Sequence, residues 1–292
     1  MKVALGVDTL SYHCRLAESE ITVEDVFTEI RSLEATYVQL DLHHVEHYSP
    51  QSLEALRSHA DALGLEIRVS GDFVGTPRAG DTPADGVARI AAWAERASIL
   101  GSPVVRVASG FYRAELATQP ELIKAEQAYV IATLQLAVDT DAAKGTQIIL
   151  ENHSDFTPEE YVEIIEAVGT GSVGVFLDLI NPVSTLSDPA AVVPILAPYA
   201  VCGHVKDYRF ESIYVPDRYH RRGFEVLWCY PGEGAADLPT LLGELTSREQ
   251  DRTYFLAIEG LDSRSGVADQ RERLDASLEY LRGLLGENFA AR

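Results

Sequence analysis

Residues 146–178, TQIILENHSDFTPEEYVEIIEAVGTGSVGVFLD, decide the fold. They begin with the apolar run Thr146–Asn152 and end with the apolar run Val173–Asp178. Both runs are short and rich in Val, Ile and Leu, which is typical of strands buried in a parallel sheet. Between the two runs, apolar residues recur at the spacing of an amphipathic helix, at Tyr161, Ile164, Ile165 and Val168. The stretch therefore predicts a strand–helix–strand unit with parallel strands.

The same alternation continues on both sides of this unit. Six further apolar runs are predicted to be strands: Val3–Asp8, Thr36–Asp41, Leu65–Gly71, Pro103–Ser109, Val201–Asp207 and Tyr254–Gly260. Amphipathic segments separate them, which predicts a series of eight βα units without a break in composition. A chain of 292 residues is long enough for these units to close into one barrel. The predicted fold is thus a (β/α)8 TIM barrel formed by residues 1–292 as a single domain, in preference to a doubly wound sheet.

Several helix boundaries are marked by the local sequence. A Thr followed three residues later by Asp or Glu predicts N-terminal capping boxes, at Thr22 with Asp25, Thr82 with Asp85 and Thr157 with Glu160. Gly64 and Gly101 are predicted to end helices, because glycine readily adopts the left-handed conformation found there.

Two segments fall outside the repeated pattern. We expect a long irregular loop at about 208–234, after the seventh strand, that covers the carboxyl face of the barrel or forms an oligomer contact. The final residues, 286–292 (GENFAAR), are expected to form a short frayed tail.

The composition is acidic and argues against several classes of partner. The 45 Asp and Glu residues outnumber the 24 Lys and Arg residues, and the formal net charge is −21. No nucleic-acid partner is expected, because binding a phosphate backbone requires clustered basic residues. Cys14, Cys202 and Cys229 suggest neither a disulfide framework nor a thiolate zinc site. With neither a signal-peptide core nor an apolar run of about 20 residues, we expect a soluble cytoplasmic protein without a membrane partner.

Four polar residues lie at or near the ends of four predicted strands: Glu151, Asp178, His204 and Glu259. The carboxyl ends of the strands of a parallel barrel meet at one rim, so we expect these side chains to converge. Burying several carboxylates without a cation costs free energy, so we expect a divalent ion among them. The three carboxylates and the one imidazole are its predicted ligands. The oxygen-rich set favours Mn²⁺, with Mg²⁺, Co²⁺ or Zn²⁺ as alternatives.

Strand alternation adds two side chains to this site, because every second residue shares a face. His153 would share the face of Glu151, and Lys206 that of His204. His153 is a candidate catalytic acid or base, because an imidazole exchanges protons near neutral pH, or else a hydrogen-bond partner of the site. Lys206 would hold a substrate oxygen or pair with a carboxylate such as Asp178.

Further candidates for substrate contacts lie on the fourth strand and after the first two strands. Arg106 alternates with Val104 and Ala108, so an inward guanidinium would bind an anion or neutralise the acidic cluster. His13 follows the first strand and His43 the second. We interpret both as substrate-pocket residues or as ordinary loop histidines.

The same residues carry a family resemblance. The motifs ENHxDFT, LDxxNP, HVKD, IEG and CYPGEG resemble the xylose isomerase-like TIM-barrel superfamily of sugar phosphate isomerases/epimerases and AP endonucleases of family 2. The resemblance implies that Glu151, Asp178, His204 and Glu259 hold one divalent ion, usually Mn²⁺. It also implies that Glu151 and Glu259 act as bases. Asn181 departs from the ketose epimerase pattern, which has a substrate-binding histidine there, although an amide still hydrogen-bonds a hydroxyl.

The ligand set and the resemblance together point to one class of intermediate. A divalent ion that binds a carbonyl and an adjacent hydroxyl acidifies the C–H between them and stabilises the enediolate that a base then generates. We therefore expect an isomerase or epimerase of a small keto-sugar, which would act as a homo-oligomer or with a partner subunit. The alternative is a lyase that eliminates from a 3-oxo-glycoside, as C-glycoside deglycosidases do, or decarboxylates an oxo-sugar acid. A non-catalytic barrel scaffold is the second alternative.

Overall fold

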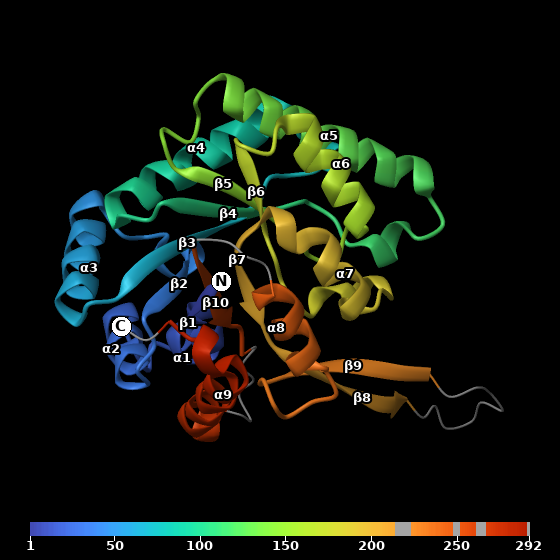
Figure 1. Cartoon of the computed structure of the whole chain (residues 1–292). Coiled ribbons are helices and arrows are strands. Elements are labelled where there is room, and N and C mark those ends of the chain that lie inside the picture. Colours follow the sequence, from blue (N-terminus) through green and yellow to red (C-terminus); the bar gives the residue numbers. More distant parts are fainter. Residues whose placement is uncertain (214–222, 248–251, 261–266, 291–292) are drawn as a thin grey trace.

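The computed structural model describes residues 1–213, 223–247, 252–260 and 267–290, and its barrel is closed by eight parallel strands (Figure 1). Their order around the barrel is β1-β10-β7-β6-β5-β4-β3-β2. The strands are β1 (Lys2–Asp8), β2 (Tyr37–Asp41), β3 (Glu66–Phe73), β4 (Val104–Ala108), β5 (Gln147–Glu151), β6 (Val173–Phe176), β7 (Ala200–Val205) and β10 (Thr253–Ile258). All eight predicted barrel strands are confirmed, and the predicted TIM-barrel fold with them.

A helix follows each barrel strand and packs on the outside of the barrel (Figure 1). These helices are α2 (Val23–Ser32), α3 (Pro50–Leu63), α4 (Pro83–Leu100), α5 (Pro120–Asp139), α6 (Pro158–Val168), α7 (Pro189–Leu196), α8 (Leu238–Thr246) and α9 (Gln270–Leu285). The short helix α1 (His13–Ala17) and the turns η1 (Thr9–Tyr12) and η2 (Leu42–Val45) lie in the first two βα loops. Within the described ranges, no helix is both long and apolar enough to span a membrane.

The predicted helix boundaries are present in the structure. Reciprocal capping boxes form at the three predicted pairs, Thr22 with Asp25, Thr82 with Asp85 and Thr157 with Glu160. Gly64 and Gly101 end α3 and α4 with φ angles of 65° and 73°, in the left-handed region that glycine adopts without strain. Local chemistry therefore sets where these helices begin and end.

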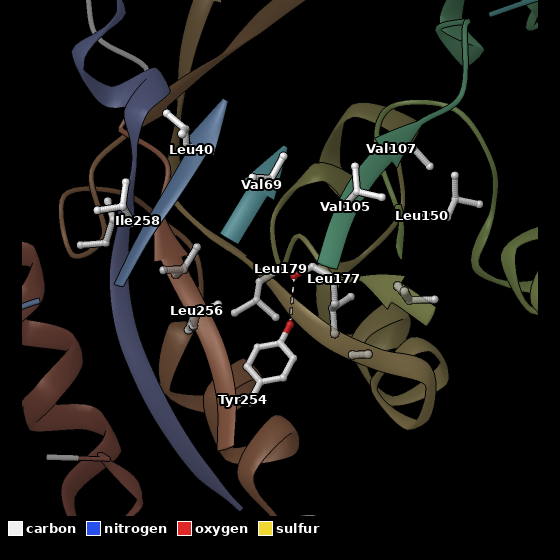
Figure 2. Packing of buried hydrophobic residues seen from close by; sticks show 14 of the residues in the cluster. Leu40, Val69, Val105, Val107, Leu150, Leu177, Leu179, Tyr254, Leu256 and Ile258 are labelled. Atoms are coloured by element: carbon white, nitrogen blue, oxygen red, sulfur yellow. Dashed lines mark hydrogen bonds between the residues drawn. The ribbon is translucent and has the colours of Figure 1, made fainter. Parts of the chain in front are cut away.

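The two faces of the barrel strands form two separate apolar clusters. Outward side chains pack against the helices and form the main core, which includes Leu40, Val69, Val105, Leu150 and Leu256 (Figure 2). Inward side chains form a second, smaller cluster inside the barrel, made of Val104, Ile149, Phe176 and Cys202. Each of these four residues is followed, two positions later in the same alternation, by a residue of the rim: Arg106, Glu151, Asp178 and His204, respectively. The inner cluster is thus the floor beneath the predicted site.

A glycine allows the sixth and seventh strands to approach closely at this point. A Cβ atom at position 203 would lie only 1.8 Å from the carbonyl oxygen of Leu177, so only glycine fits there. The hydroxyl of Tyr254 donates to the same carbonyl at 3.5 Å (Figure 2). The close approach matters for the site, because Asp178 follows Leu177 and His204 follows Gly203.

The segment after β7 differs from the prediction of an irregular loop at 208–234. Strands β8 (Asp207–Ile213) and β9 (Gly223–Cys229) form an antiparallel hairpin that projects beyond the barrel (Figure 1). One face of this hairpin is aromatic, with ring centroids of Phe210 and Phe224 5.2 Å apart. The connection, residues 214–222, lies outside the described residues. Its nine residues exceed the two to five of common hairpin turns, so no two-residue turn motif marks this pair of strands in the sequence.

The end of the chain also differs from the prediction. Residues 286–290 do not fray: Phe289 forms a parallel bridge with Val3, and Ala290 N–H donates to the Val3 carbonyl at 2.8 Å. Phe289 also packs against the main core. Docking of this aromatic residue stabilises the segment, and a terminal position alone does not reveal it. Residues 291–292 lie outside the described residues.

Candidate metal centre

The predicted ligands converge at the carboxyl-terminal rim of the barrel. One ligand atom from each of Glu151, Asp178 and His204 lies within 4.8 Å of the others, and all three side chains are buried. Nδ1 of His204 is 3.8 Å from Glu151 Oε1 and 3.8 Å from Asp178 Oδ2. Glu259 is beside them, with its Oε1 3.6 Å from the same nitrogen. One imidazole nitrogen therefore faces oxygen atoms of three carboxylates.

Asp8, at the end of β1, sets the orientation of the His204 ring. Its Oδ2 lies 2.8 Å from His204 Nε2, and both side chains are fully buried. A carboxylate in this position holds the proton on Nε2 and leaves the lone pair on Nδ1. Nδ1 is buried and has no hydrogen-bond partner among the described residues. An unpartnered nitrogen that faces three carboxylates fits a metal ligand better than a satisfied core histidine.

Replacing Asp8 with Asn is expected to weaken binding of a divalent ion by about 10- to 100-fold, because the amide NH2 that then faces Nε2 favours the ring proton on Nδ1, the nitrogen needed for the ion. Asn keeps an oxygen for the hydrogen bond from Leu10 N–H, 2.7 Å in the wild-type protein, so η1 still forms. Titration calorimetry with Mn²⁺ measures the change. The matched control is Asp188→Asn, since Asp188 is exposed and caps α7 through Ala190 N–H at 3.0 Å. Wild-type affinity in Asp8→Asn would contradict this role.

Asp178 has a single oxygen that accepts no hydrogen bond from the main chain. Its Oδ1 accepts hydrogen bonds from the main-chain N–H groups of Ile180 and Asn181, both at 2.8 Å. Asn152 holds the same segment in place: its side chain donates to the Asp178 carbonyl at 2.9 Å and accepts from Asp178 N–H at 2.7 Å. Oδ2 is left to face the ring of His204.

Glu151 is held at both of its carboxylate oxygens. Arg106 pairs with Oε2 through Nη2, and Asn181 donates from Nδ2 to Oε1 at 3.2 Å. Burial raises the pKa of Glu151, but Arg106, His153 and His204 more than offset this and hold the pKa below its usual value. Arg106 thus pairs with the acidic cluster, the second of its two predicted roles. Substrate contacts by Arg106 and Asn181 stay predictions.

Lys206 lies between two of the predicted ligands. Its Nζ is 2.5 Å from Asp178 Oδ2, and it also pairs with Oε2 of Glu259. Burial lowers the pKa of Lys206, but the two carboxylates raise it above its usual value. Burial raises the pKa of Glu259, but Lys206 more than offsets this effect, and the pKa lies below its usual value. The predicted ion pair with Asp178 is therefore present, and a contact of Lys206 with a substrate oxygen stays a prediction.

The buried side chains at this rim carry more negative than positive charge. Six charged side chains are buried here: Asp8, Glu151, Asp178, Glu259, Arg106 and Lys206. With the His204 ring neutral, the carboxylates exceed the cations by two charges, and burying uncompensated charge costs free energy. One divalent ion balances this excess, and oxygen atoms with one imidazole nitrogen are suitable ligands for it. The residues present therefore fit a divalent ion held by the four predicted ligands.

His153 lies beside this ligand set, but strand alternation does not place it there. β5 ends at Glu151, and the chain turns so that His153 N–H donates to the Tyr161 hydroxyl at 3.0 Å. The rings of Phe73 and Tyr112 bound the imidazole at centroid distances of 5.8 and 5.4 Å. Nδ1 of His153 is buried and has no hydrogen-bond partner in the described part of the chain. The role of His153 as a catalytic acid or base stays a prediction.

His13 and His43 belong to a separate histidine cluster near η1 and η2. Nδ1 of His13 is 3.2 Å from Nε2 of His44, and the ring centroids of His13 and His43 are 6.1 Å apart. With His47 they line a cavity of about 340 Å³, which also borders α1 and the start of α2. Burial, with the neighbouring imidazoles, lowers the pKa of His44 to about 4, so this ring is neutral at physiological pH. Contact of His13 and His43 with a substrate stays a prediction.

Three residues of the rim were not among the predicted site residues: Asp8, Asp41 and Asn152. Asp8 and Asp41 close β1 and β2, so the strand-end position that identified Glu151 would have identified them as well. Burial and the Asp8 carboxylate raise the pKa of Asp41 to about 7. Asn152 has no comparable signal, because its role depends on the backbone of Asp178, 26 residues away in the sequence.

The fold and the site agree with one known family. A family model of xylose isomerase-like TIM barrels matches residues 27–284. The chain therefore belongs to the xylose isomerase-like TIM barrel family, which confirms the resemblance seen in its motifs. No curated protein matches the chain at a significant level.

Several solved structures share the fold over nearly the whole chain. The IOLI protein, crystallised with a bound zinc atom, has a TM-score of 0.73 at 15% identity, with 100% of both chains covered. A D-psicose 3-epimerase in the presence of D-fructose has a TM-score of 0.71 at 16% identity, covering 98% of this chain and 100% of the other. The probable 3-DHS dehydratase AsbF from Bacillus anthracis has a TM-score of 0.69 at 17% identity, covering 96% and 98%. At these identities, the likeness shows the fold alone.

Proposed function

We propose that this protein is a divalent-metal-dependent sugar isomerase or epimerase that acts on a small keto-sugar through an enediolate. The observation that carries the proposal is the position of His204 Nδ1, a buried and unpartnered nitrogen that faces three carboxylates. Structures with the same fold include a D-psicose 3-epimerase and a zinc-containing protein, which agrees with the proposal.

The proposed ligands are the four strand-end residues Glu151, Asp178, His204 and Glu259. Mn²⁺ is the proposed ion because the set is rich in oxygen, with Mg²⁺, Co²⁺ and Zn²⁺ as alternatives. When bound, the ion supplies positive charge that acidifies a C–H next to a carbonyl group. Asp8 keeps His204 in the required tautomer, and Asn152 keeps the Asp178 backbone in register with it.

Glu151 is the proposed base. Arg106 and Asn181 orient its carboxylate, and its lowered pKa keeps it ionised, so that it accepts a proton from the substrate carbon. Glu259 is the second carboxylate of the site. A proton returned to the opposite face of the same carbon gives epimerisation, whereas a proton returned to the neighbouring carbon gives isomerisation. Lys206 is proposed to hold an oxygen of the substrate.

One observation favours a second reaction, elimination from an oxo-sugar. His153 is outside the ligand set, and its buried Nδ1 has no hydrogen-bond partner among the described residues, which supports a role in proton exchange. Phe73 and Tyr112 beside it form an aromatic wall that suits an apolar or aromatic leaving group. The dehydratase AsbF shares the fold. A lyase that acts on a 3-oxo-glycoside, or on an oxo-sugar acid, is therefore the alternative.

Solvent exchange tests both reactions. The protein with Mn²⁺ is incubated in D₂O with a panel of keto-sugars and 3-oxo-glycosides, and the small molecules are analysed by NMR after protein and metal are removed. We expect deuterium at the carbon next to the carbonyl, and the identity of the product distinguishes epimer, isomer and elimination product. Protein treated with EDTA is the control and is expected to be inactive. Metal-loaded protein that incorporates no deuterium into any substrate would contradict enediolate chemistry.

A further inference from the structure

Lys206 and a divalent ion would use the same oxygen atom of Asp178, Oδ2, which also faces Nδ1 of His204. The Lys206 ammonium is 2.5 Å from Asp178 Oδ2 and also pairs with Oε2 of Glu259. The other oxygen of Asp178 already accepts hydrogen bonds from Ile180 N–H and Asn181 N–H, both at 2.8 Å. A divalent ion that binds Asp178 would therefore share Oδ2 with the Lys206 ammonium, because Oδ1 already accepts two hydrogen bonds.

The two cations also repel each other. Groups that share carboxylate oxygens lie only a few ångströms apart, and like charges repel strongly at that separation in a buried site. Arg106, paired with Glu151, adds a further positive charge within the same rim. Keeping Lys206 in its observed position beside a bound ion would therefore weaken the binding of that ion.

The Lys206 ammonium already has a second partner beside the two carboxylates, at the outer limit of a cation–π contact. The ring of Trp228, near the base of the hairpin on β9, has its centroid 5.5 Å from Lys206 Nζ. The flexible four-carbon stem of lysine allows its ammonium to move, and a tryptophan ring stabilises a cation over its face. Movement towards Trp228 would separate the ammonium from the ligand carboxylates without removing it from the site.

We propose that Lys206 is a built-in counter-ion of the metal site: it neutralises Asp178 and Glu259 until a divalent ion replaces it, and its ammonium then turns towards Trp228. The proposal rests on the metal site of the proposed function. It makes Lys206 a positioning residue that keeps two ligand carboxylates together while it competes with the ion. A monovalent cation gains nothing by replacing an ammonium of equal charge, so Lys206 selects for divalent ions.

Titration of the full-length protein, first freed of metal with EDTA, tests the competition. Lys206→Met keeps the length of the side chain without its charge, and it is expected to bind Mn²⁺ at least about tenfold more tightly than the wild-type protein. The matched control is Lys124→Met, which removes the same charge from an exposed position on α5 and is expected to bind as the wild-type protein does. The rise in melting temperature on adding Mn²⁺ is expected to be larger in Lys206→Met than in either of the others.

Tryptophan fluorescence gives a readout that does not depend on affinity. The chain has two tryptophans, Trp93 and Trp228, so Trp93→Phe leaves Trp228 as the sole reporter. Mg²⁺ is used because it does not itself quench fluorescence. We expect Mg²⁺ to change the emission of Trp93→Phe and to leave that of Trp93→Phe/Lys206→Met unchanged.

The outcomes separate this inference from the proposed function. If the wild-type protein binds Mn²⁺ at least as tightly as Lys206→Met does, the proposed role of Lys206 is wrong. The metal site itself would not be affected by that result. Absence of Mn²⁺ binding in both proteins would overturn the metal site and the inference together. If Lys206→Met does not fold, the fluorescence of Trp228 in Trp93→Phe still tests the inference. Emission that stays constant while this variant binds Mg²⁺ would overturn the proposed movement of Lys206.

Discussion

The Glu259→Gln variant is expected to lose stoichiometric metal binding and about 10³-fold of kcat/KM while it keeps its fold. Glu259 follows β10, where its N–H donates to the Val205 carbonyl of β7 at 3.1 Å. Glutamine has the same shape, so this main-chain bond and the closure of the barrel are unaffected. It lacks the charge, and it leaves the His204 ring and the Lys206 ammonium facing one carboxylate fewer.

Two measurements check this expectation. Metal content and Mn²⁺ titration report the loss of the ligand, and kcat/KM on the keto-sugar that proves active reports the loss of chemistry. Glu225→Gln is the matched control, because Glu225 is an exposed carboxylate on β9. Circular dichroism establishes that both variants fold. Full activity with one ion per chain in Glu259→Gln would remove Glu259 from the ligand set.

The His153→Gln variant is expected to lose about 10²- to 10⁴-fold of kcat, the usual contribution of an acid or base group, with little change in Mn²⁺ affinity. Glutamine forms hydrogen bonds but does not exchange a proton at neutral pH. The bond from residue 153 to the Tyr161 hydroxyl comes from the main chain, so it survives the substitution. The variant therefore separates proton transfer from metal binding, which Glu259→Gln does not.

Kinetics and titration on the same preparation test the role of His153. His59→Gln is the matched control: His59 lies on α3, with its Nε2 3.1 Å from the Glu24 carbonyl on α2. We expect this control to retain wild-type kcat. If His153→Gln retains it as well, proton transfer falls to Glu151 and Glu259, and the lyase alternative loses the observation that favours it. Weaker Mn²⁺ binding in His153→Gln would instead assign His153 to the support of the ligands.

The barrel was predictable because each βα unit carries its own local signals. The run Thr146–Asn152 is apolar on both faces, the next segment has helical spacing, and the Thr157–Glu160 pair caps that helix. These signals depend on neighbours a few residues apart. Repeated along the chain, they leave few topologies other than a closed barrel.

The prediction failed where structure depends on distant partners. Residues 207–213 and 223–229 form a hairpin although nine residues separate the two strands in the sequence, and the aromatic alternation of Tyr208 and Phe210 was a weak local sign of it. Residues 286–290 are ordered because Phe289 meets Val3 at the opposite end of the chain. A terminal position and a polar composition indicate fraying only when no such partner exists.

Some residues of the site were also predictable from local patterns, and others were not. Strand ends and alternation identified Glu151, Asp178, His204 and Glu259 from the sequence, because parallel strands in a barrel bring their carboxyl ends to one rim. The same rule applied to β1 would have added Asp8. Alternation on β4 also placed Arg106 against the acidic cluster, but no local pattern indicated that Asn181 donates to the carboxylate of Glu151.

By itself, the sequence determined the order of the strands and helices, the residues that face inward, and the four residues that gather at the rim. Those properties follow from hydrophobic periods of two and about 3.6 residues, which are local. The tertiary structure alone decided which nitrogen of His204 is free, and that Lys206 pairs with Asp178 Oδ2, one of the two roles expected for it. Each of these depends on contacts between residues far apart in the sequence. Asp8 and His204, for example, are 196 positions apart, yet Asp8 Oδ2 lies 2.8 Å from His204 Nε2. Hydrogen bonds and ion pairs at such distances are set by the packed barrel, because no short stretch of chain contains both partners.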